Sequence, residues 1–154
     1  MKKIIFAIVC AVTFTMSISA QTVDDLFKEF RDKDNVECME IPKAMMSMAS
    51  GMMKKEKGND LIKKIDHIRI LSIENNDAVC KEFKARAANL NKKAYETMMN
   101  SNEDNEKALI LVKTKGDYIT EMVILALEPS ECALIQLRGK FNSNDIKGLQ
   151  TTFN

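Results

Sequence analysis

Four strand-like segments follow one another in the second half of the chain, and the connections between them are short. The segments span residues 94–101, 107–114, 118–127 and 132–138. Gly116 and Pro129 lie in two of the connections, where a positive φ or a missing N–H donor suits a turn. Because parallel strands require a long crossover, neighbouring segments are expected to pair antiparallel. The sequence therefore predicts an antiparallel β-meander over about residues 94–139.

Alternation in the last two segments predicts that the sheet has two different faces. In the third segment, one face carries Ile119, Val123, Leu125 and Leu127. In the fourth, a wholly apolar set comprises Ala133, Ile135 and Leu137. The other set of the fourth segment combines Leu134 with Gln136 and Arg138. One face must therefore be covered by an apolar layer, and helices are the layer that we expect.

Residues 1–20 have the pattern of a secretory signal peptide. Lys2 and Lys3 precede a mostly apolar run, which ends on small residues at Ala20. The run is too short to span a membrane, and no later apolar run of the sequence approaches spanning length. We therefore expect cleavage after Ala20 and a periplasmic or secreted mature protein without a transmembrane segment.

Residues 21–154 have the length of a single domain. Apolar residues at helical spacing and capping residues predict helices over 22–31, 43–55, 60–65, 77–93 and 146–149. Two further strands, 36–41 and 67–74, precede the meander. The sequence thus predicts an α+β fold, in which the antiparallel β-meander (about 94–139) is extended by two earlier strands and helices pack mainly on one face. The order of the two early strands stays open.

Composition and motifs argue against several classes of function. The chain has a formal charge of +1, which becomes −1 without Lys2 and Lys3, and it contains no Trp. A nucleic-acid partner is not expected of a nearly neutral exported chain. The sequence also lacks the motifs of serine hydrolases, zinc peptidases and phosphate-binding loops. We therefore predict no catalytic, cofactor-binding or metal-binding residues and expect that the protein is not an enzyme.

The histidine and the cysteines suggest no chemistry by their spacing. His67 is the only histidine, and no partner that would activate it is evident, so we interpret it as structural. Cys38, Cys80 and Cys132 follow the leader, and their odd number leaves at least one thiol unpaired or paired between chains. They form no C-x-x-C motif. Buried free cysteines are the favoured interpretation, and their disulfide state stays open.

One predicted helix is unusually rich in methionine. Soft thioethers bind Cu(I), so a copper site that uses Met45, Met48 and Met52 is one alternative. The favoured interpretation is that Met45, Met48, Ala49 and Met52 follow helical spacing and pack on the sheet. A third interpretation is an adaptable binding surface, because Met46 and Met53 lie beside that stripe.

The chain as a whole resembles a known family. The resemblance rests on the Met-rich helix that begins at 41–46, the strand 67–74, the segment 94–99 before an acidic turn, and the closing segment 134–149. These features are similar to those of small exported proteins of Bacteroidota grouped as domain of unknown function 4252. The resemblance implies an envelope location and brings no catalytic residues. An Asp-Gly turn would be expected where Asn102–Asn105 stands, so the register of that hairpin is open.

The leading functional expectation is a non-catalytic envelope module. Such a module would bind a protein or a small apolar ligand between its sheet and its helices. An enzyme with paired carboxylates is an alternative, because residues distant in sequence can be brought together by folding. A Cu(I)-handling protein that uses the Met-rich helix is the other alternative.

Overall fold

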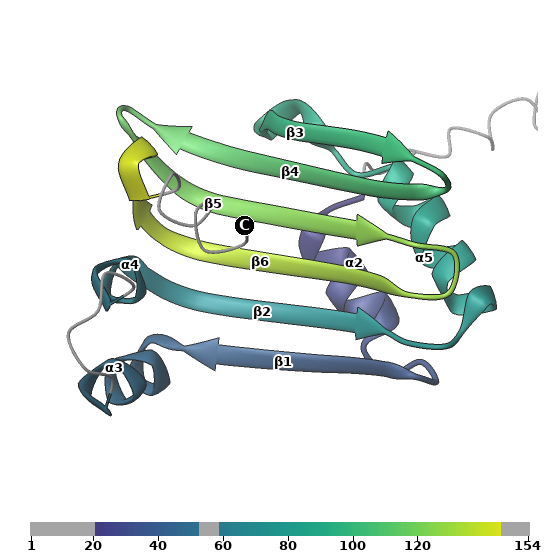
Figure 1. Ribbon diagram of the computed structural model, residues 1–154, viewed down its shortest axis with the longest axis horizontal. Helices are drawn as coiled ribbons and strands as arrows, with labels where there is room; N and C mark the ends of the chain where they lie inside the picture. Colours follow the sequence, from purple (N-terminus) through teal and green to yellow (C-terminus); the bar gives the residue numbers. More distant parts are fainter. Residues whose placement is uncertain (1–20, 53–58, 146–154) are drawn as a thin grey trace, which may run out of the picture.

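The computed structural model describes residues 21–52 and 59–145, and within them the chain folds around a six-stranded sheet (Figure 1). The strands are β1 (Val36–Pro42), β2 (Ile65–Ile73), β3 (Glu96–Glu103), β4 (Glu106–Lys115), β5 (Tyr118–Leu127) and β6 (Cys132–Phe141). All neighbouring strands pair antiparallel, in the order β1-β2-β6-β5-β4-β3. The α+β fold and the meander, now β3 to β6, are confirmed. The early strands add to the meander through β2, which pairs with β6.

The hairpin between β3 and β4 is tighter than the sequence indicated. Glu103 pairs with Glu106, so the turn contains only Asp104 and Asn105. Both residues have positive φ, 43° and 70°. Asp and Asn tolerate this left-handed region better than other residues that carry a Cβ, so they replace the expected Asp-Gly. The register that the sequence left open is thereby defined.

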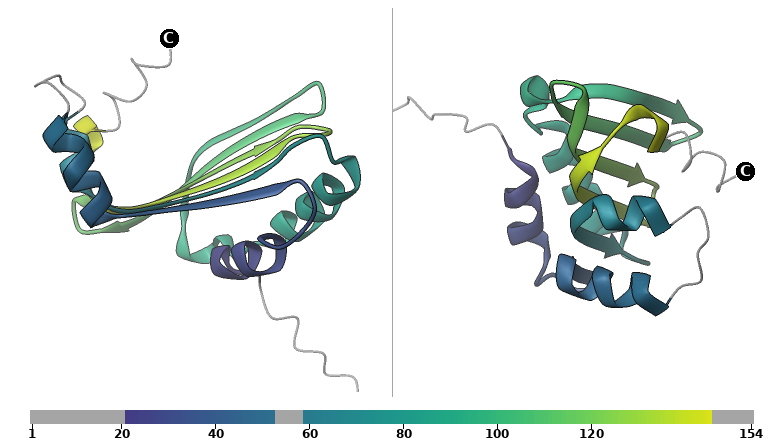
Figure 2. Two further views of the ribbon diagram at one scale, coloured as in Figure 1. Left: turned by 90° about the horizontal axis from the view of Figure 1, so that it is seen from below. Right: turned by 90° about the vertical axis from the view of Figure 1, so that its left-hand side faces the viewer.

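Two helices cover one face of the sheet. α2 (Val23–Phe30) and α5 (Asp77–Ala88) lie behind the sheet in Figure 1 and below it in the left view of Figure 2. Thr22 begins α2 with a capping box that it forms with Asp25. Asn76 caps α5 by accepting a hydrogen bond from the Val79 N–H. α5 ends well before residue 93, and a short 3-10 helix, η1 (Lys92–Ala94), leads into β3.

The main core lies between these two helices and the sheet. Phe30 of α2 and Phe83 of α5 meet edge to face, with ring centroids 5.0 Å apart and planes at 86°. The sheet contributes alternate residues of its strands, namely Leu71, Ile73, Leu109, Leu111, Val123, Leu125, Leu127, Cys132 and Leu134. Burial of this one face against α2 and α5 is the main apolar contribution to stability on that side.

The other helices lie at one end of the sheet, on the opposite side (Figure 2, left). They are α3 (Lys43–Met52) and α4 (Asn59–Lys64). Met46 is buried with Ile65 and Phe141, whereas Met45 and Met48 are 57% and 69% exposed. The prediction that Met45 and Met48 pack on the sheet is therefore wrong. α3 contacts β1, β2 and α4, and Met46 is its buried side chain, whereas Ala44, Met45, Met48 and Ala49 are exposed.

A β-bulge in β5 changes the face on which Ile119 lies. Against β4, Glu121 pairs with Lys113 and Ile119 pairs with Thr114, so Thr120 is the extra residue in β5. Ile119 therefore packs in the Met46 cluster and not beside Val123, as its alternation predicted. An extra residue in one strand reverses the side to which the preceding residues point. The predicted signal peptide (1–20), Met53 and the predicted helix at 146–149 lie outside the described residues.

Candidate interaction surface

A chain of polar side chains crosses the helix-covered face beside the core. Gln136, which is 1% exposed, donates from Nε2 to Glu121 Oε1 at 2.7 Å. Its own Oε1 accepts from Arg69 Nε at 2.7 Å. The Tyr95 hydroxyl donates to the same Glu121 oxygen at 2.8 Å, and Lys113 Nζ lies 3.4 Å from the other. The buried carboxylate and amide are thus satisfied within the protein.

Arg69 connects this polar chain to the helical layer. Its guanidinium contacts the Asp24 carboxylate of α2 and lies over the Phe27 ring, 4.3 Å from the centroid. The hydrogen bond from Arg69 is the largest of the effects that lower the pKa of Asp24. An Arg that stacks on an aromatic ring and binds a carboxylate holds α2 against β2 by two different interactions. Its contacts therefore assign Arg69 a structural role.

The pKa values of Glu121 and Tyr95, the two titratable groups at the centre of these polar side chains, do not favour proton transfer near neutral pH. Burial alone would raise the pKa of Glu121, but hydrogen bonds from Gln136 and Tyr95 and the charge of Lys113 hold it below its ordinary value. The pKa of Tyr95 is raised, first by burial and then by its hydrogen bond to Glu121. The carboxylate thus stays charged and the phenol stays protonated. A general acid or base would instead need a pKa near the working pH.

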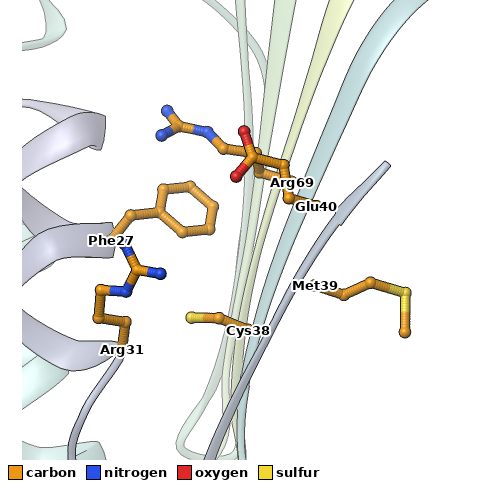
Figure 3. Close-up of a pocket in the computed structure, with 6 residues that line it drawn as sticks. All are labelled: Phe27, Arg31, Cys38, Met39, Glu40 and Arg69. Carbon is orange, nitrogen blue, oxygen red and sulfur yellow. The ribbon is translucent and has the colours of Figure 1, made fainter. Parts of the chain in front are cut away.

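A small cleft between α2 and β1 holds an exposed thiol (Figure 3). About 370 Å³ of space, open to solvent, is lined by Phe27, Arg31, Cys38, Met39, Glu40 and Arg69. Although the thiol is exposed, the cleft partly buries it, and this partial burial is the largest of the effects that raise the pKa of Cys38. The reactive thiolate is therefore not favoured there. Figure 3 also shows that Cys38 points toward α2, whereas the side chain of Met39 extends away on the other side of β1. The cleft therefore lacks an activated nucleophile.

The other two cysteines lie together in the core. Cys80 is fully buried on α5, and Cys132 is 3% exposed at the start of β6. Burial, followed by a hydrogen bond with Cys80, raises the pKa of Cys132 to about 12. Both thiols are free, so the interpretation as small buried hydrophobes is confirmed for this pair. It is wrong for Cys38, because β1 is an edge strand and leaves that thiol exposed.

The histidine has a partner that the sequence did not identify. His67 Nε2 lies 2.7 Å from Glu40 Oε1, across the β1–β2 pair. In the part of the chain that the structure describes, no three His, Cys, Asp or Glu residues gather as a metal site. The copper hypothesis concerns thioethers instead. Loss of Cu(I) binding after replacement of Met45, Met48 and Met52 by Leu would support that alternative, and unchanged binding would end it.

The face opposite α2 and α5 carries aligned rows of side chains, one from each strand. The strand register places Met39, Ile70, Ile135, Ile124, Ile110 and Met99 side by side in that order. A second row contains Ile41, Ile68, Leu137, Met122, Val112 and Glu96, and most of it is covered within the chain. Ile41, Ile68 and Leu137 pack in the Met46 cluster, and Met122 and Val112 are buried. A third, smaller row contains Glu37, Ser72, Ala133, Ala126, Ala108 and Ser101. We call the surface formed by the central row and the third row the open face.

Neither α2 nor α5 covers the open face, onto which Figure 1 looks. In the central strands, Ile124 and Ile135 remain partly exposed while their neighbours toward the helices are buried. Met39 and Met99, at the two ends of the central row, are 59% and 47% exposed. α3 and α4 cover only one border of the face, where Ile68 packs in the Met46 cluster. A contiguous exposed apolar surface of this kind is typical of an interaction site.

Part of the evidence for an exposed apolar face is visible in the sequence. The wholly apolar set of β6, Ala133, Ile135 and Leu137, indicated a face that needs an apolar cover. α2 and α5 cover the other face, with Leu134 and Gln136. Of the apolar set, Leu137 packs in the Met46 cluster, whereas Ala133 and Ile135 are not covered by the described helices. Alternation reveals the two faces of each strand, but it does not reveal register. The alignment of isoleucines from four strands was therefore not foreseeable.

Comparison with known families gives one match. The model of the family described as "Domain of unknown function (DUF4252)" matches residues 28–149. The matched region extends from within α2 to beyond β6 and therefore includes every strand of the sheet. No curated protein matches the chain. Among the described helices, none is both long and apolar enough to cross a membrane.

Proposed function

We propose that this chain, which belongs to the DUF4252 family of domains of unknown function, is a non-catalytic envelope protein that binds a partner protein on its open face. The observation that carries the proposal is the central row of the open face, from Met39 to Met99. Its apolar side chains span the sheet and remain partly exposed. Their burial against a partner would gain the apolar free energy that α2 and α5 already supply on the other face.

The shape of the surface favours a protein over a small ligand. Sites for small apolar molecules are concave and enclose most of the ligand surface. The open face is instead a broad sheet surface, with a raised border at α3 and α4 (Figure 2, left). Core residues such as Phe30 and Phe83 fill the centre of the space between the sheet and α2 and α5. Only its edges are open, at the cleft between α2 and β1 and at a pocket between α5 and strands β4 and β5. The proposed site therefore lies on the other side of the sheet.

A non-catalytic role is supported by the hydrogen bonds of the polar side chains around Glu121 and Gln136. Glu121 and Gln136 have their hydrogen-bonding capacity occupied by protein groups. A catalytic group needs an open position for a reacting atom.

Export is the second part of the proposal, and it rests on the basic start and apolar run of residues 1–20.

The experiment is photocrosslinking in the producing cells. A photoreactive amino acid replaces Met39 or Met99 on the open face, and Lys81, an exposed residue of α5, serves as the matched control. We expect the two open-face positions to give the same covalent adduct in the envelope fraction, and the Lys81 position to give none. Absence of adducts at both open-face positions, or equal adducts at Lys81, would contradict the proposal. Recovery of a chain that retains residues 1–20 in the cytosol would contradict export.

A further inference from the structure

We infer that a pocket beside the end of α5 binds a small carboxylate with an alkyl chain, the chemistry of a short- or medium-chain fatty acid. About 560 Å³ of space, open to solvent, lies there between α5, η1 and the strands β4 and β5. The pocket is on the side of the sheet that α2 and α5 cover (Figure 2, left), whereas the open face is on the other side. The inference therefore goes beyond the proposed function and concerns a second, separate site.

The pocket exists because the side chains of α5 that face the sheet become small at the end of the helix. Phe83 is fully buried, and Ala87 follows it one turn later on the same side of the helix. Ala88 lies beside Ala87 at the pocket, where the helix ends. Two methyl groups do not fill the space that a ring fills one turn earlier, so β4 and β5 are not fully covered there.

The floor of the pocket is apolar. Leu109 of β4 and Leu125 of β5 are cross-strand partners, and Leu127 follows Leu125 on the same face. All three leucines are buried in the core, so they present a packed surface to the pocket. An alkyl chain on this floor would leave water, and its own loss of exposed apolar area would be the main gain on binding. The volume of the pocket is within the range of small-molecule sites.

The rim of the pocket is cationic. Lys107 is the cross-strand partner of Leu127, so its side chain starts from the same face. Lys84 of α5 and Lys92 of η1 lie around the same opening. In the part of the chain that the structure describes, none of these three lysines forms an ion pair, and no carboxylate lines the pocket. Other described lysines do form ion pairs, namely Lys33, Lys43, Lys64 and Lys113. Three ammonium groups without a counter-charge favour an anionic ligand.

The floor and the rim together define the class of ligand. Ammonium groups alone would also attract inorganic phosphate, but an apolar floor adds affinity only for an anion that carries an apolar chain. Among the described residues that line the pocket none is aromatic, so it offers no stacking surface for a nucleotide base. Asn105, in the turn between β3 and β4, supplies an amide that can donate to a carboxylate oxygen. A carboxylate at the rim, with its alkyl chain on the floor, satisfies both parts of the pocket.

The first experiment is a titration of the protein with butyrate, hexanoate and octanoate, followed by the amide NMR signals. Each added methylene group that the pocket buries should tighten binding by up to about fourfold. The signals at the end of α5, in η1 and at Leu109 and Leu125 should shift. Hexan-1-ol, which has a similar chain without the charge, should bind about tenfold more weakly than hexanoate. Equal affinity for butyrate and octanoate, or for hexan-1-ol and hexanoate, would overturn the inference.

The second experiment removes the charges of the rim. Lys84→Gln, Lys92→Gln and Lys107→Gln, combined in one variant, should weaken octanoate binding about tenfold, because the carboxylate loses its charged partners. The control makes the same change in net charge at three exposed lysines that do not line the pocket, through Lys28→Gln, Lys81→Gln and Lys115→Gln. The control variant should bind octanoate as the wild type does. Equal weakening in both variants would show a general effect of net charge and would overturn the site.

The third experiment fills the pocket without a change in charge. Ala88→Leu introduces a larger side chain at an exposed position of the opening and should weaken octanoate binding about tenfold. Ala85→Leu, exposed on the same helix and outside the pocket lining, should leave binding unchanged. Thermal unfolding of each variant checks that the fold is retained. Octanoate binding that neither the lysine variant nor Ala88→Leu weakens would overturn the site.

Other occupants of the pocket would give other results. Absence of octanoate binding at millimolar concentration would overturn this inference and leave the proposal for the open face unaffected. Co-sedimentation with phosphatidylglycerol vesicles, without binding of free octanoate, would show that a membrane presents the acyl chain and would overturn the free carboxylate. Tighter binding of a short peptide that ends in leucine than of octanoate would assign the pocket to a protein terminus and would also overturn it.

Discussion

At the scale of single residues, the most constrained group is the buried carboxylate of Glu121. It is 7% exposed, yet it carries a charge because Gln136 and Tyr95 donate to it and Lys113 lies close by. Loss of one partner would leave the others with unsatisfied polar atoms in a dry environment. The polar chain therefore orders β5, β6 and the segment before β3 relative to one another.

Replacement of Glu121 by Gln should destabilise the protein in a pH-dependent manner. At neutral pH we expect a loss of about 1–2 kcal/mol in the free energy of unfolding, because neutral hydrogen bonds replace charged ones. The pKa of Glu121 is lowered in the folded protein from its ordinary 4.5. Its contribution is therefore complete above that value and is lost as the pH falls through the folded-state pKa. Urea unfolding at about pH 7 and pH 3 should show the difference between wild type and Glu121→Gln become smaller in acid. A difference that is equal at both pH values would contradict this assignment.

At the scale of elements, the α2–α5 layer is held by few but large side chains. Phe30 and Phe83 are fully buried, and they join the two helices to each other as well as to the sheet. The helices themselves are 8 and 12 residues long, lengths at which an isolated helix is unstable in water. Packing on the sheet is therefore the reason that these helices form.

Truncation of Phe83 should test this dependence. Phe83→Ala removes a fully buried ring, and we expect a loss of about 3–5 kcal/mol in the free energy of unfolding. Lys81→Ala, on the exposed side of the same helix, is the matched control and should change stability by less than about 0.5 kcal/mol. Equal effects of the two substitutions, measured by urea unfolding, would show that α5 is not held by the core.

At the scale of the whole molecule, one close approach joins β6 to the junction of α4 and β2, which is distant in sequence. Gly139 of β6 faces the junction of α4 and β2, and a Cβ built there would lie 2.1 Å from the Lys64 carbonyl oxygen. That contact involves the backbone, so it cannot be relieved by the rotation of a side chain. A glycine at this point permits β6 to lie against β2 where the register shifts.

Gly139→Ala should consequently destabilise the protein by about 1–3 kcal/mol or more, because the backbone of β2 must move. Gly51→Ala offers a matched control on α3, where nothing lies within 4 Å of the added Cβ. That second substitution should be neutral or stabilising by up to about 1 kcal/mol, since Ala favours a helix. Thermal unfolding of both variants provides the comparison, and a neutral Gly139→Ala would contradict the close approach.

Much of the local structure was foreseeable from particular residues. Thr22 before an apolar stripe predicted α2, and the short connections around Gly116 and Pro129 predicted antiparallel neighbours. These features depend on interactions within a few residues, so the sequence alone determines them. The matched family adds no functional residues, and the buried chain from Arg69 to Tyr95 was not foreseen because its members are distant in sequence.

Only the tertiary structure decided which residues lie on each face of the sheet and which of them are covered by helices. The bulge at Thr120 reversed the face on which Ile119 lies, and Met46 is buried where Met45 and Met48 were expected to be. Pairing of β2 with β6 aligned residues from separate strands into the rows of the open face. The sequence by itself determined which residues alternate along each strand, because that period is set by the backbone. Register and coverage depend on long-range packing, so they were decided only when the strands and helices came together.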